Sequence, residues 1–188
     1  MPTTTAPVRE RILDAATRRY YAEGIRAVSA DRLIAEAGVS KVTFYRHFPT
    51  KDDLIAAYLT QQVAHTQQLF TEKRAELAGD ACGVLRWYAE GVGAFASSPG
   101  FRGCPFINAA AELSSPDHPG HRIVADNRTW LVTQFAELLG ELGVDEVETK
   151  AEQLMMLRDG ALVAGYVGRT PEAVAATLTA AGRAVIGC

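Results

Sequence analysis

Residues 38–51 of the chain read GVSKVTFYRHFPTK and place basic, hydroxyl and aromatic side chains on one short helical segment directly after a glycine. Gly38 accepts the left-handed backbone conformation that ends a helix, and Ser40 can accept amide hydrogen bonds at the start of the next helix. The preceding segment, residues 30–37, has apolar side chains at helical spacing, with Ser29 placed to cap its first turn. Two short helices joined by such a turn predict a helix-turn-helix.

The second helix of this motif has an apolar side and a polar side. Phe44 and Phe48, four residues apart, are expected in the core, and Val42 is expected to face the first helix. The remaining side chains are all able to donate hydrogen bonds: Lys41, Thr43, Tyr45, Arg46 and His47. Such a face suits a helix that lies on DNA, although for each residue taken singly a solvated surface is the simpler interpretation.

A longer set of positions follows one known pattern: an amphipathic first helix ending in glycine, a hydroxyl residue, Ala-Gly-Val-Ser, an aromatic–Tyr pair, His-Phe, and Lys followed by Leu. The positions are Ile12, Leu13, Asp14, Ala15, Ala16, Tyr20, Gly24, Ser29, 37–40, Phe44, Tyr45, His47, Phe48, Lys51 and Leu54. With these residues, segment 8–55 resembles the DNA-binding domain of the TetR family of bacterial transcriptional regulators. The resemblance covers about a quarter of the chain, and a generic helix-turn-helix specifies far fewer of these positions.

The resemblance implies contacts to the phosphate backbone. Tyr45, His47 and Lys51 are expected to reach phosphates, and Ser29 and Thr43 to add hydroxyl contacts near them. Phosphate contacts fix the register of a protein on the duplex and supply salt-dependent affinity.

Sequence selection needs contacts to base edges instead. Lys41 lies near the amino end of the recognition helix, where a donor can reach guanine O6 and N7. Val42 stands where the family often has Gly, Ala or Pro and could touch a thymine methyl. Arg46 could serve either role.

The charge distribution is uneven along the chain. Residues 1–51 contain nine basic and five acidic side chains, a net charge of +4, whereas residues 52–188 contain 10 basic and 17 acidic ones, a net charge of −7. In such a chain, the basic amino-terminal segment is expected to face a polyanion, and the acidic remainder is expected to stay away from it.

Helical patterns continue downstream with almost no alternating strand signal. Helix starts are predicted by Thr50, Asp80, Asp145 and Thr170 as capping residues, by Pro105 at a first helical position, and after His118-Pro119-Gly120. The sequence therefore predicts an all-α protein, with a three-helix helix-turn-helix DNA-binding head at residues 8–51. A helical effector-binding and dimerisation body is expected at residues 52–188.

Length and composition restrict the class of protein further. The 188 residues suffice for a small head and a larger body, and no apolar stretch is long enough to cross a membrane. The amino terminus has no apolar signal region, so a cytoplasmic protein is expected. Cys82, Cys104 and Cys188 are too few and too scattered for a disulfide framework or a zinc cluster and are expected to be thiols, and no metal or cofactor is predicted.

The body is expected to dimerise and to bind a small molecule. The resemblance implies a homodimer through the last two helices, which are rich in bulky and small apolar residues, and packing within one chain is the alternative. The resemblance also implies a repressor that leaves a two-fold symmetric operator when an effector binds. The middle helices offer aromatic and flexible apolar side chains for an effector pocket, although each alone is more simply a core residue: Trp87, Tyr88, Phe95, Phe106, Trp130, Phe135 and Met155.

Polar residues within this apolar region are further candidates for the pocket. Asn108 and Glu112 lie one helical turn apart, and Arg158-Asp159 interrupts an apolar helix. They can orient the polar group of an effector, and an ion pair between Glu112 and Arg158 is the other interpretation.

Cys104 raises two alternatives. It precedes a predicted helix start, where the helix dipole stabilises a thiolate, so redox or electrophile sensing is a second hypothesis beside a small buried thiol. With His118 or His121 and Asp117 it could form a cysteine hydrolase, and the two histidines have the spacing of a metal pair. Since no phosphate loop or nucleophile elbow is present, an enzyme is not expected.

Overall fold

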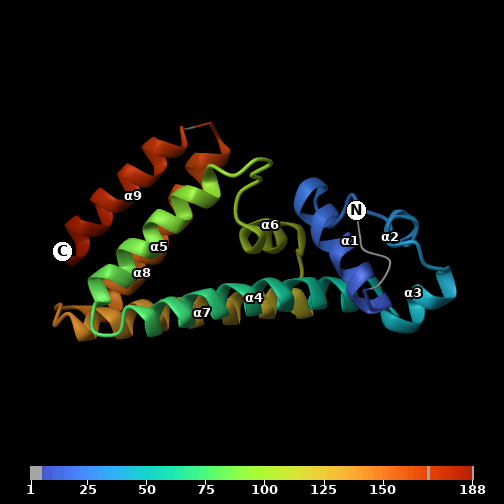
Figure 1. The fold of residues 1–188 in the computed structure, drawn as a ribbon, viewed down its shortest axis with the longest axis horizontal. Coiled ribbons are helices and arrows are strands. Elements are labelled where there is room, and N and C mark those ends of the chain that lie inside the picture. The colour runs from blue at the N-terminus through green and yellow to red at the C-terminus, as the bar shows by residue number, and fades with distance from the viewer. Residues whose placement is uncertain (1–5, 169, 188) are drawn as a thin grey trace. The chain divides into compact units, whose positions relative to one another are not determined.

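The computed structural model describes residues 6–168 and 170–187. Within these ranges every regular element is an α-helix, as the sequence predicted (Figure 1). In chain order the helices are α1 (Val8–Glu23), α2 (Ala30–Ala37), α3 (Lys41–His47), α4 (Lys51–Glu76), α5 (Ala81–Ala96), α6 (Pro105–Glu112), α7 (Pro119–Glu141), α8 (Val147–Tyr166) and α9 (Pro171–Ile186).

Contacts divide the chain into two compact units, of which the first is discontinuous. It contains the residues up to Ala64 together with Pro105–Ala125, and the second contains His65–Cys104 together with the residues from Asp126 onward. The first unit therefore holds α1, α2, α3 and α6, and α4 and α7 contribute to both. The boundary that the sequence predicts after residue 51 separates DNA binding from effector binding. Compact units defined by contacts do not test it, so it stays a prediction.

Local capping produces the helix-turn-helix as predicted. The Oγ atom of Ser29 accepts a hydrogen bond from the Arg32 amide at 3.4 Å, and that of Ser40 accepts one from the Thr43 amide at 3.1 Å. Gly38 ends α2 in the left-handed region, with φ 62° and ψ 44°, so a residue with a β-carbon would be strained there.

The first residues of α4 are capped reciprocally. The Thr50 Oγ1 atom accepts from the Asp53 amide, and an Asp53 carboxylate oxygen accepts from the Thr50 amide, both at 3.0 Å. This is a capping box with Asp in the place usually taken by Glu. The predicted caps Asp80 and Thr170 are also confirmed, because their side chains accept from the amides of Gly83 and Ala173.

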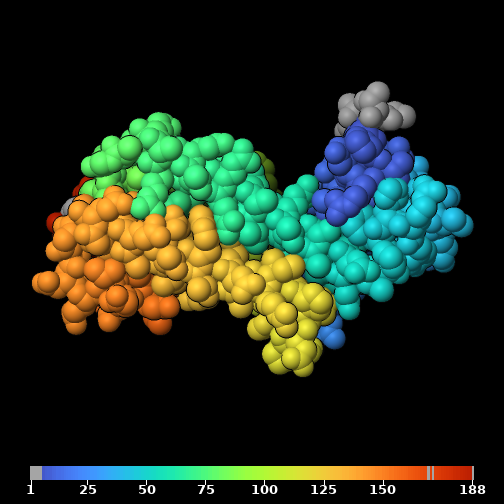
Figure 2. All heavy atoms as spheres, turned by 90° about the horizontal axis from the view of Figure 1, so that it is seen from below, coloured from blue at the N-terminus to red at the C-terminus, as the bar shows by residue number. Residues whose placement is uncertain are grey.

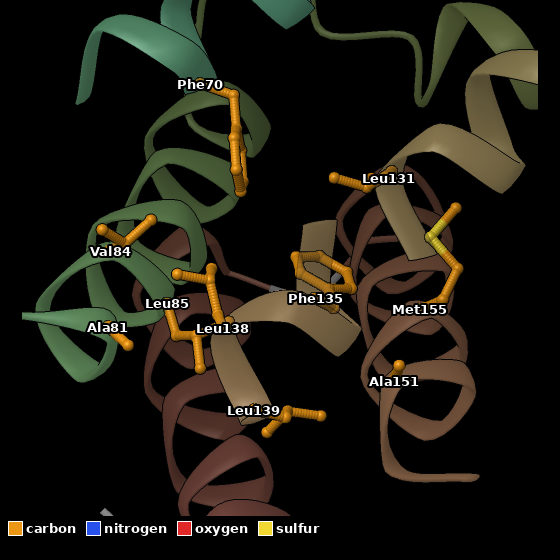
Figure 3. Packing of buried hydrophobic residues seen from close by; sticks show 10 residues of the cluster. All are labelled: Phe70, Ala81, Val84, Leu85, Leu131, Phe135, Leu138, Leu139, Ala151 and Met155. Atoms are coloured by element: carbon orange, nitrogen blue, oxygen red, sulfur yellow. The ribbon is translucent and has the colours of Figure 1, made fainter. Parts of the chain in front are cut away.

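The second unit is built around an aromatic and aliphatic core (Figure 3). Phe70 from α4 lies edge-on to Trp130 at 5.5 Å and to Tyr88 at 5.9 Å between ring centroids. Phe135 contacts Tyr88 in the same geometry at 5.2 Å. Around these rings the buried aliphatic and small side chains close the core: Ala81, Val84, Leu85, Leu131, Leu138, Leu139, Ala151 and Met155.

An ion-paired face joins two long helices of this unit. Arg74 of α4 donates to Gln134 at 3.0 Å and to Glu141 at 2.6 Å, and it also pairs with Glu137. These acceptors lie on α7, which runs alongside the second half of α4 (Figure 2).

Two helix starts differ from the predictions. The helix expected after Gly120 begins at Pro119, because proline needs no amide partner in the first turn. The helix expected at Asp145 begins at Val147, and its capping residue is Glu146, whose backbone is left-handed with φ 58° and whose side chain makes no capping bond.

The cysteines are not all thiols. Cys104 is free and buried, whereas Cys82 is disulfide-bonded, which corrects the expectation at that position. Cys188 lies outside the described residues. No helix in the described ranges is long and apolar enough to span a bilayer.

Candidate functional site

Helix α3 turns its apolar side inward and leaves the predicted contact residues outward. Phe44 and Phe48 are each only 2% exposed, which anchors the helix in the core of the first unit. Lys41, Tyr45 and Arg46 are exposed on its surface. Val42 is 80% exposed, so the expectation that it packs against α2 is wrong.

The exposed cations of α3 are held only weakly by the protein. Lys41 Nζ lies 3.6 Å from an Asp31 carboxylate oxygen, and both side chains are mostly exposed. An exposed pair of this kind contributes about 0–1 kcal/mol and is readily exchanged for another anion. Arg46 makes no hydrogen bond or ion pair with any part of the chain that the structure describes.

The neighbouring predicted contact residues are partly engaged. Tyr45 is 40% exposed, and its ring lies edge-on to Phe44 at 5.3 Å. The Thr43 hydroxyl accepts from the Ser40 hydroxyl at 2.9 Å. His47 is half-buried in the last turn, and Ser29 stays exposed while it caps α2.

Lys51 has a partner within the protein. Its Nζ donates to the carbonyl oxygen of Val28 at 2.9 Å, so the ammonium holds the segment that leads into α2. Burial lowers the pKa of Lys51 below its usual value, and the carboxylates of Glu112 and Asp52 oppose this shift. The side chain is half-buried, and a phosphate contact from it stays a prediction.

Arg11 stabilises the helix-turn-helix and was not singled out from the sequence. Its guanidinium donates to the Ala37 carbonyl from Nε at 3.2 Å and from Nη2 at 2.9 Å, and Nη2 also donates to the Gly38 carbonyl at 2.9 Å. These carbonyls lie at the carboxyl end of α2, where a cation also interacts favourably with the helix dipole. Because the contact spans 26 residues, no local pattern indicates it.

Much of the positive charge of the head is used in ion pairs between α1 and α2. Glu36 pairs with Arg18 and Arg19, and Glu23 pairs with Arg19 and Arg32. Hydrogen bonds from Arg19 and Arg32 lower the pKa of Glu23. The net charge of the head is therefore larger than the positive charge that is available for DNA on α3. The cations on the exposed surface of α3 are Lys41 and Arg46.

Glu112 has a role that differs from the predicted one. One carboxylate oxygen accepts from the Ile25 amide at 3.0 Å, and the other accepts from the Arg26 amide at 2.7 Å. A β-carbon at Gly24, where φ is +94°, would lie 3.0 Å from the first oxygen. Helix α6 thus holds the turn between α1 and α2, and the ion pair suggested between Glu112 and Arg158 is absent because each has other partners.

The predicted pocket residues do not form one cluster. Tyr88, Phe135 and Arg158 line a cavity of about 100 Å³ bounded by α5, α7, α8 and α9. Trp87 and Trp130 pack against the core of the second unit, and Met155 is buried within it. Phe95 lies edge-on to Phe101, whereas Phe106, Asn108 and Glu112 belong to the first unit.

Arg158 is the centre of the polar residues in the second unit. Its Nε donates to the Tyr88 hydroxyl at 3.3 Å, Nη1 to Asp159 at 2.7 Å, and Nη2 to the sulfur of Cys104 at 3.4 Å. Cys104 is 2% exposed. The structure thus brings together Cys104, Arg158 and Asp159, which the sequence analysis had treated separately, and a role for them in effector binding stays a prediction.

One histidine of the hydrolase alternative, His118, has structural partners. His118 Nδ1 accepts from the Gly120 amide at 2.9 Å, and Nε2 lies 3.2 Å from an Asp52 carboxylate oxygen. Both ring nitrogens are thus engaged, in the manner of a cap for α7. Among the described residues no group of three or more His, Cys, Asp or Glu side chains is arranged to hold a metal ion.

A capped helix-turn-helix with an outward polar recognition helix defines a DNA-binding protein of the helix-turn-helix class. Residues 12–58 match the family model for bacterial regulatory proteins of the tetR family. The chain is 42% identical to SCO4454, a TetR-family transcriptional regulator from Streptomyces coelicolor, over 96% of this chain and 94% of that one, with a TM-score of 0.90. The chain therefore belongs to the TetR family and is a DNA-binding transcriptional regulator.

Curated relatives agree with this assignment. The chain is 25% identical to the HTH-type transcriptional regulator LmrA of Bacillus subtilis over 76% of either protein. It is also 32% identical to the HTH-type transcriptional regulator AcrR of Shigella flexneri, over 42% of this chain and 36% of that protein. Both relatives are named as transcriptional regulators.

Proposed function

We propose that the protein is a cytoplasmic repressor that binds a pseudo-palindromic operator as a homodimer and leaves it when a small apolar or amphipathic effector binds. The main support is the outward face of α3, where Lys41, Val42 and Arg46 are exposed beside a well-anchored apolar side. An exposed valine on an otherwise polar helix is suited to a thymine methyl, and Lys41 to a guanine edge.

Backbone contacts complete the proposed interface. Tyr45 and His47 flank the carboxyl half of α3, and Ser29, Thr43 and Lys51 lie at or near helix starts, where phosphates are favoured. In this proposal the Lys51 ammonium either moves from the Val28 carbonyl to a phosphate, or stays on that carbonyl while the other side chains contact the phosphates. Either way, the affinity is expected to fall steeply with salt.

The outer side of α8 and α9 supports the homodimer. Exposed apolar residues gather on α8, where Met156 is 64%, Val163 49% and Tyr166 51% exposed. A groove lined by the two helices lies beside them and includes Gly160 and Ala164, whose small side chains allow close helix packing. Such a surface is typical of a protein–protein interface, and a dimer places its two recognition helices in half-sites about one helical turn of DNA apart.

Selection of bound duplexes from a random pool, followed by sequencing, tests the proposal. We expect a two-fold symmetric consensus, and affinity for it that weakens as salt rises. Arg46→Ala and Tyr45→Phe are the informative variants, and Lys150→Ala, a cation on α8 of the second unit, is the control. The absence of a symmetric consensus, or equal binding by Arg46→Ala and the unchanged protein, would contradict it.

A thiol-based regulator is the second candidate, and the contact of Cys104 with Arg158 favours it. The Nη2 atom of Arg158 donates to the Cys104 sulfur at 3.4 Å. However, the sulfur is buried, and reactive cysteines are usually accessible. The rate at which an alkylating reagent labels the folded protein distinguishes a sensor from a structural thiol.

A further inference from the structure

The cavity in the second unit has an unusual charge distribution. Its walls are mainly apolar, with Leu85, Phe135 and Leu178 among them, yet three arginines also line it: Arg86, Arg158 and Arg183. No aspartate or glutamate is among the described residues of the lining. The lining therefore offers cationic groups in a space that is otherwise suited to hydrocarbon.

Arg158 is held as a buried cation whose hydrogen-bonding capacity is not filled. A guanidinium has five N–H donors, and the structure gives partners to three of them: Tyr88, Asp159 and Cys104. One of these partners is a sulfur atom, which is a weak acceptor. Burial raises the pKa of Tyr88, so this hydroxyl stays neutral and contributes no negative charge.

The acid that pairs with Arg158 is shared with a second arginine. Asp159 pairs with Arg158 at 2.7 Å and also with Arg128. Two arginines and one aspartate carry a net charge of +1, and the side chains of Arg158 and Asp159 are only 13% and 22% exposed. The Arg128 side chain is 40% exposed and reaches water, whereas Arg158 is nearly buried and shares its counter-ion, so a further anion beside Arg158 would add to its stabilisation.

We propose that the effector of this regulator is an amphipathic anion, with an apolar body no larger than a single ring in the cavity and a carboxylate on Arg158, beside Arg86 and Arg183 of the same lining. The inference rests on the proposed effector-controlled function and assigns the chemical class of the ligand. The cavity measures about 100 Å³, which is less than the volume of about 150 Å³ that holds benzene in another protein core, so a single ring is the upper limit for the apolar body. A cationic ligand would face three arginines, and a neutral one would form weaker hydrogen bonds with Arg158 than a carboxylate does.

Binding of matched probes to the full chain tests this assignment. Benzoate, phenylacetate and 4-methylpentanoate are titrated to about 10 mM, since fragments of this size bind weakly, beside the corresponding neutral amides and the amines benzylamine and phenethylamine. Trp87 and Trp130 are the two tryptophans of the chain, and both pack on the core that includes Phe135, so intrinsic fluorescence reports binding. Calorimetry provides the affinity. We expect at least one carboxylate to bind tenfold or more tightly than its amide, and no amine to bind.

Variants test whether the arginines of the cavity are responsible for carboxylate binding. Arg158→Gln leaves Asp159 paired with Arg128 and is expected to lower carboxylate affinity at least tenfold without changing that of the amide. The double substitution of Arg86 and Arg183 by Gln, at exposed positions, is expected to lower it about threefold. Lys150→Gln, on the same helix as Arg158 but outside the cavity lining, is the control and should have no effect.

The outcomes distinguish this inference from the function on which it rests. If no carboxylate binds, or if an amide or amine binds as tightly, while the selected duplex is still bound, the anion assignment is wrong and DNA recognition stands. If carboxylates bind through Arg158 but leave the duplex affinity unchanged, the site is real and its control of DNA binding is refuted.

Discussion

Replacement of Glu112 is expected to loosen the turn that leads into the helix-turn-helix. A hydrogen bond to a charged group contributes about 1.5–3 kcal/mol, and a buried amide left without a partner costs about 1–3 kcal/mol. The Arg26 amide is exposed and can bond to water, whereas that of Ile25 is half-buried. We therefore expect Glu112→Ala to destabilise the turn by about 2–3 kcal/mol, and Glu112→Gln, which keeps one acceptor, by about 1–2 kcal/mol.

Hydrogen exchange measures this loss where it occurs. A change of 2–3 kcal/mol corresponds to exchange about 30- to 150-fold faster for the amides of residues 25 and 26. The same turn precedes Ser29 and contains the Val28 carbonyl that Lys51 holds, so weaker binding to the selected duplex should accompany the faster exchange. Glu90→Ala, an exposed glutamate on α5, is the control. Unchanged exchange at residue 25 in Glu112→Ala would refute the assigned role.

Four further outcomes are expected. Met156→Glu, at an exposed groove position of α8, should convert the dimer to a folded monomer in light scattering; a dimer of unchanged mass would exclude this surface. Tyr20→Phe should be neutral or stabilise the protein by about 1 kcal/mol in urea unfolding, because the buried Tyr20 hydroxyl has no hydrogen-bond partner among the described residues; a clear loss would reveal a hidden partner. Since hydrogen bonds from Arg19 and Arg32 lower the pKa of Glu23 below its ordinary value of 4.5, their contribution to stability is present above pH 4.5 and is lost as the pH falls through the lowered value; Glu23→Gln should flatten that part of the stability profile, and an unaltered profile would count against the pairing. Cys104→Ser should preserve DNA binding and its release by a non-oxidising ligand; loss of every response would support the thiol sensor.

The part of the fold that local chemistry controls was predictable. Ser29, Gly38 and Ser40 act on backbone groups within a few residues of themselves, so the sequence alone indicates the helix-turn-helix. The start of α8 was misplaced because Glu146 adopts a left-handed backbone, for which its side chain gives no signal. Val42 was misplaced because helical spacing does not show which side a neighbouring helix covers.

Contacts between distant residues were not predictable in the same way. Glu112 meets the amides of residues 25 and 26 across more than 80 positions, and Arg11 meets the Ala37 carbonyl across 26. The sequence shows a carboxylate in an apolar region but not its partner, so an effector contact and a structural bond are equally compatible with it. Arg158 was identified for the same reason, and its environment of Tyr88, Cys104 and Asp159 needed the structure.

The discontinuity of the first compact unit limits how this regulator can be dissected. An excised fragment ending near Ala64 would omit α6 and the start of α7, and with them the carboxylate that binds the turn after α1 and the imidazole that pairs with Asp52. If only the amino-terminal segment were fused to the sensor domain of another regulator, its helix-turn-helix would lack these contacts. A functional graft needs the recipient to supply an equivalent acid at the end of its own α6.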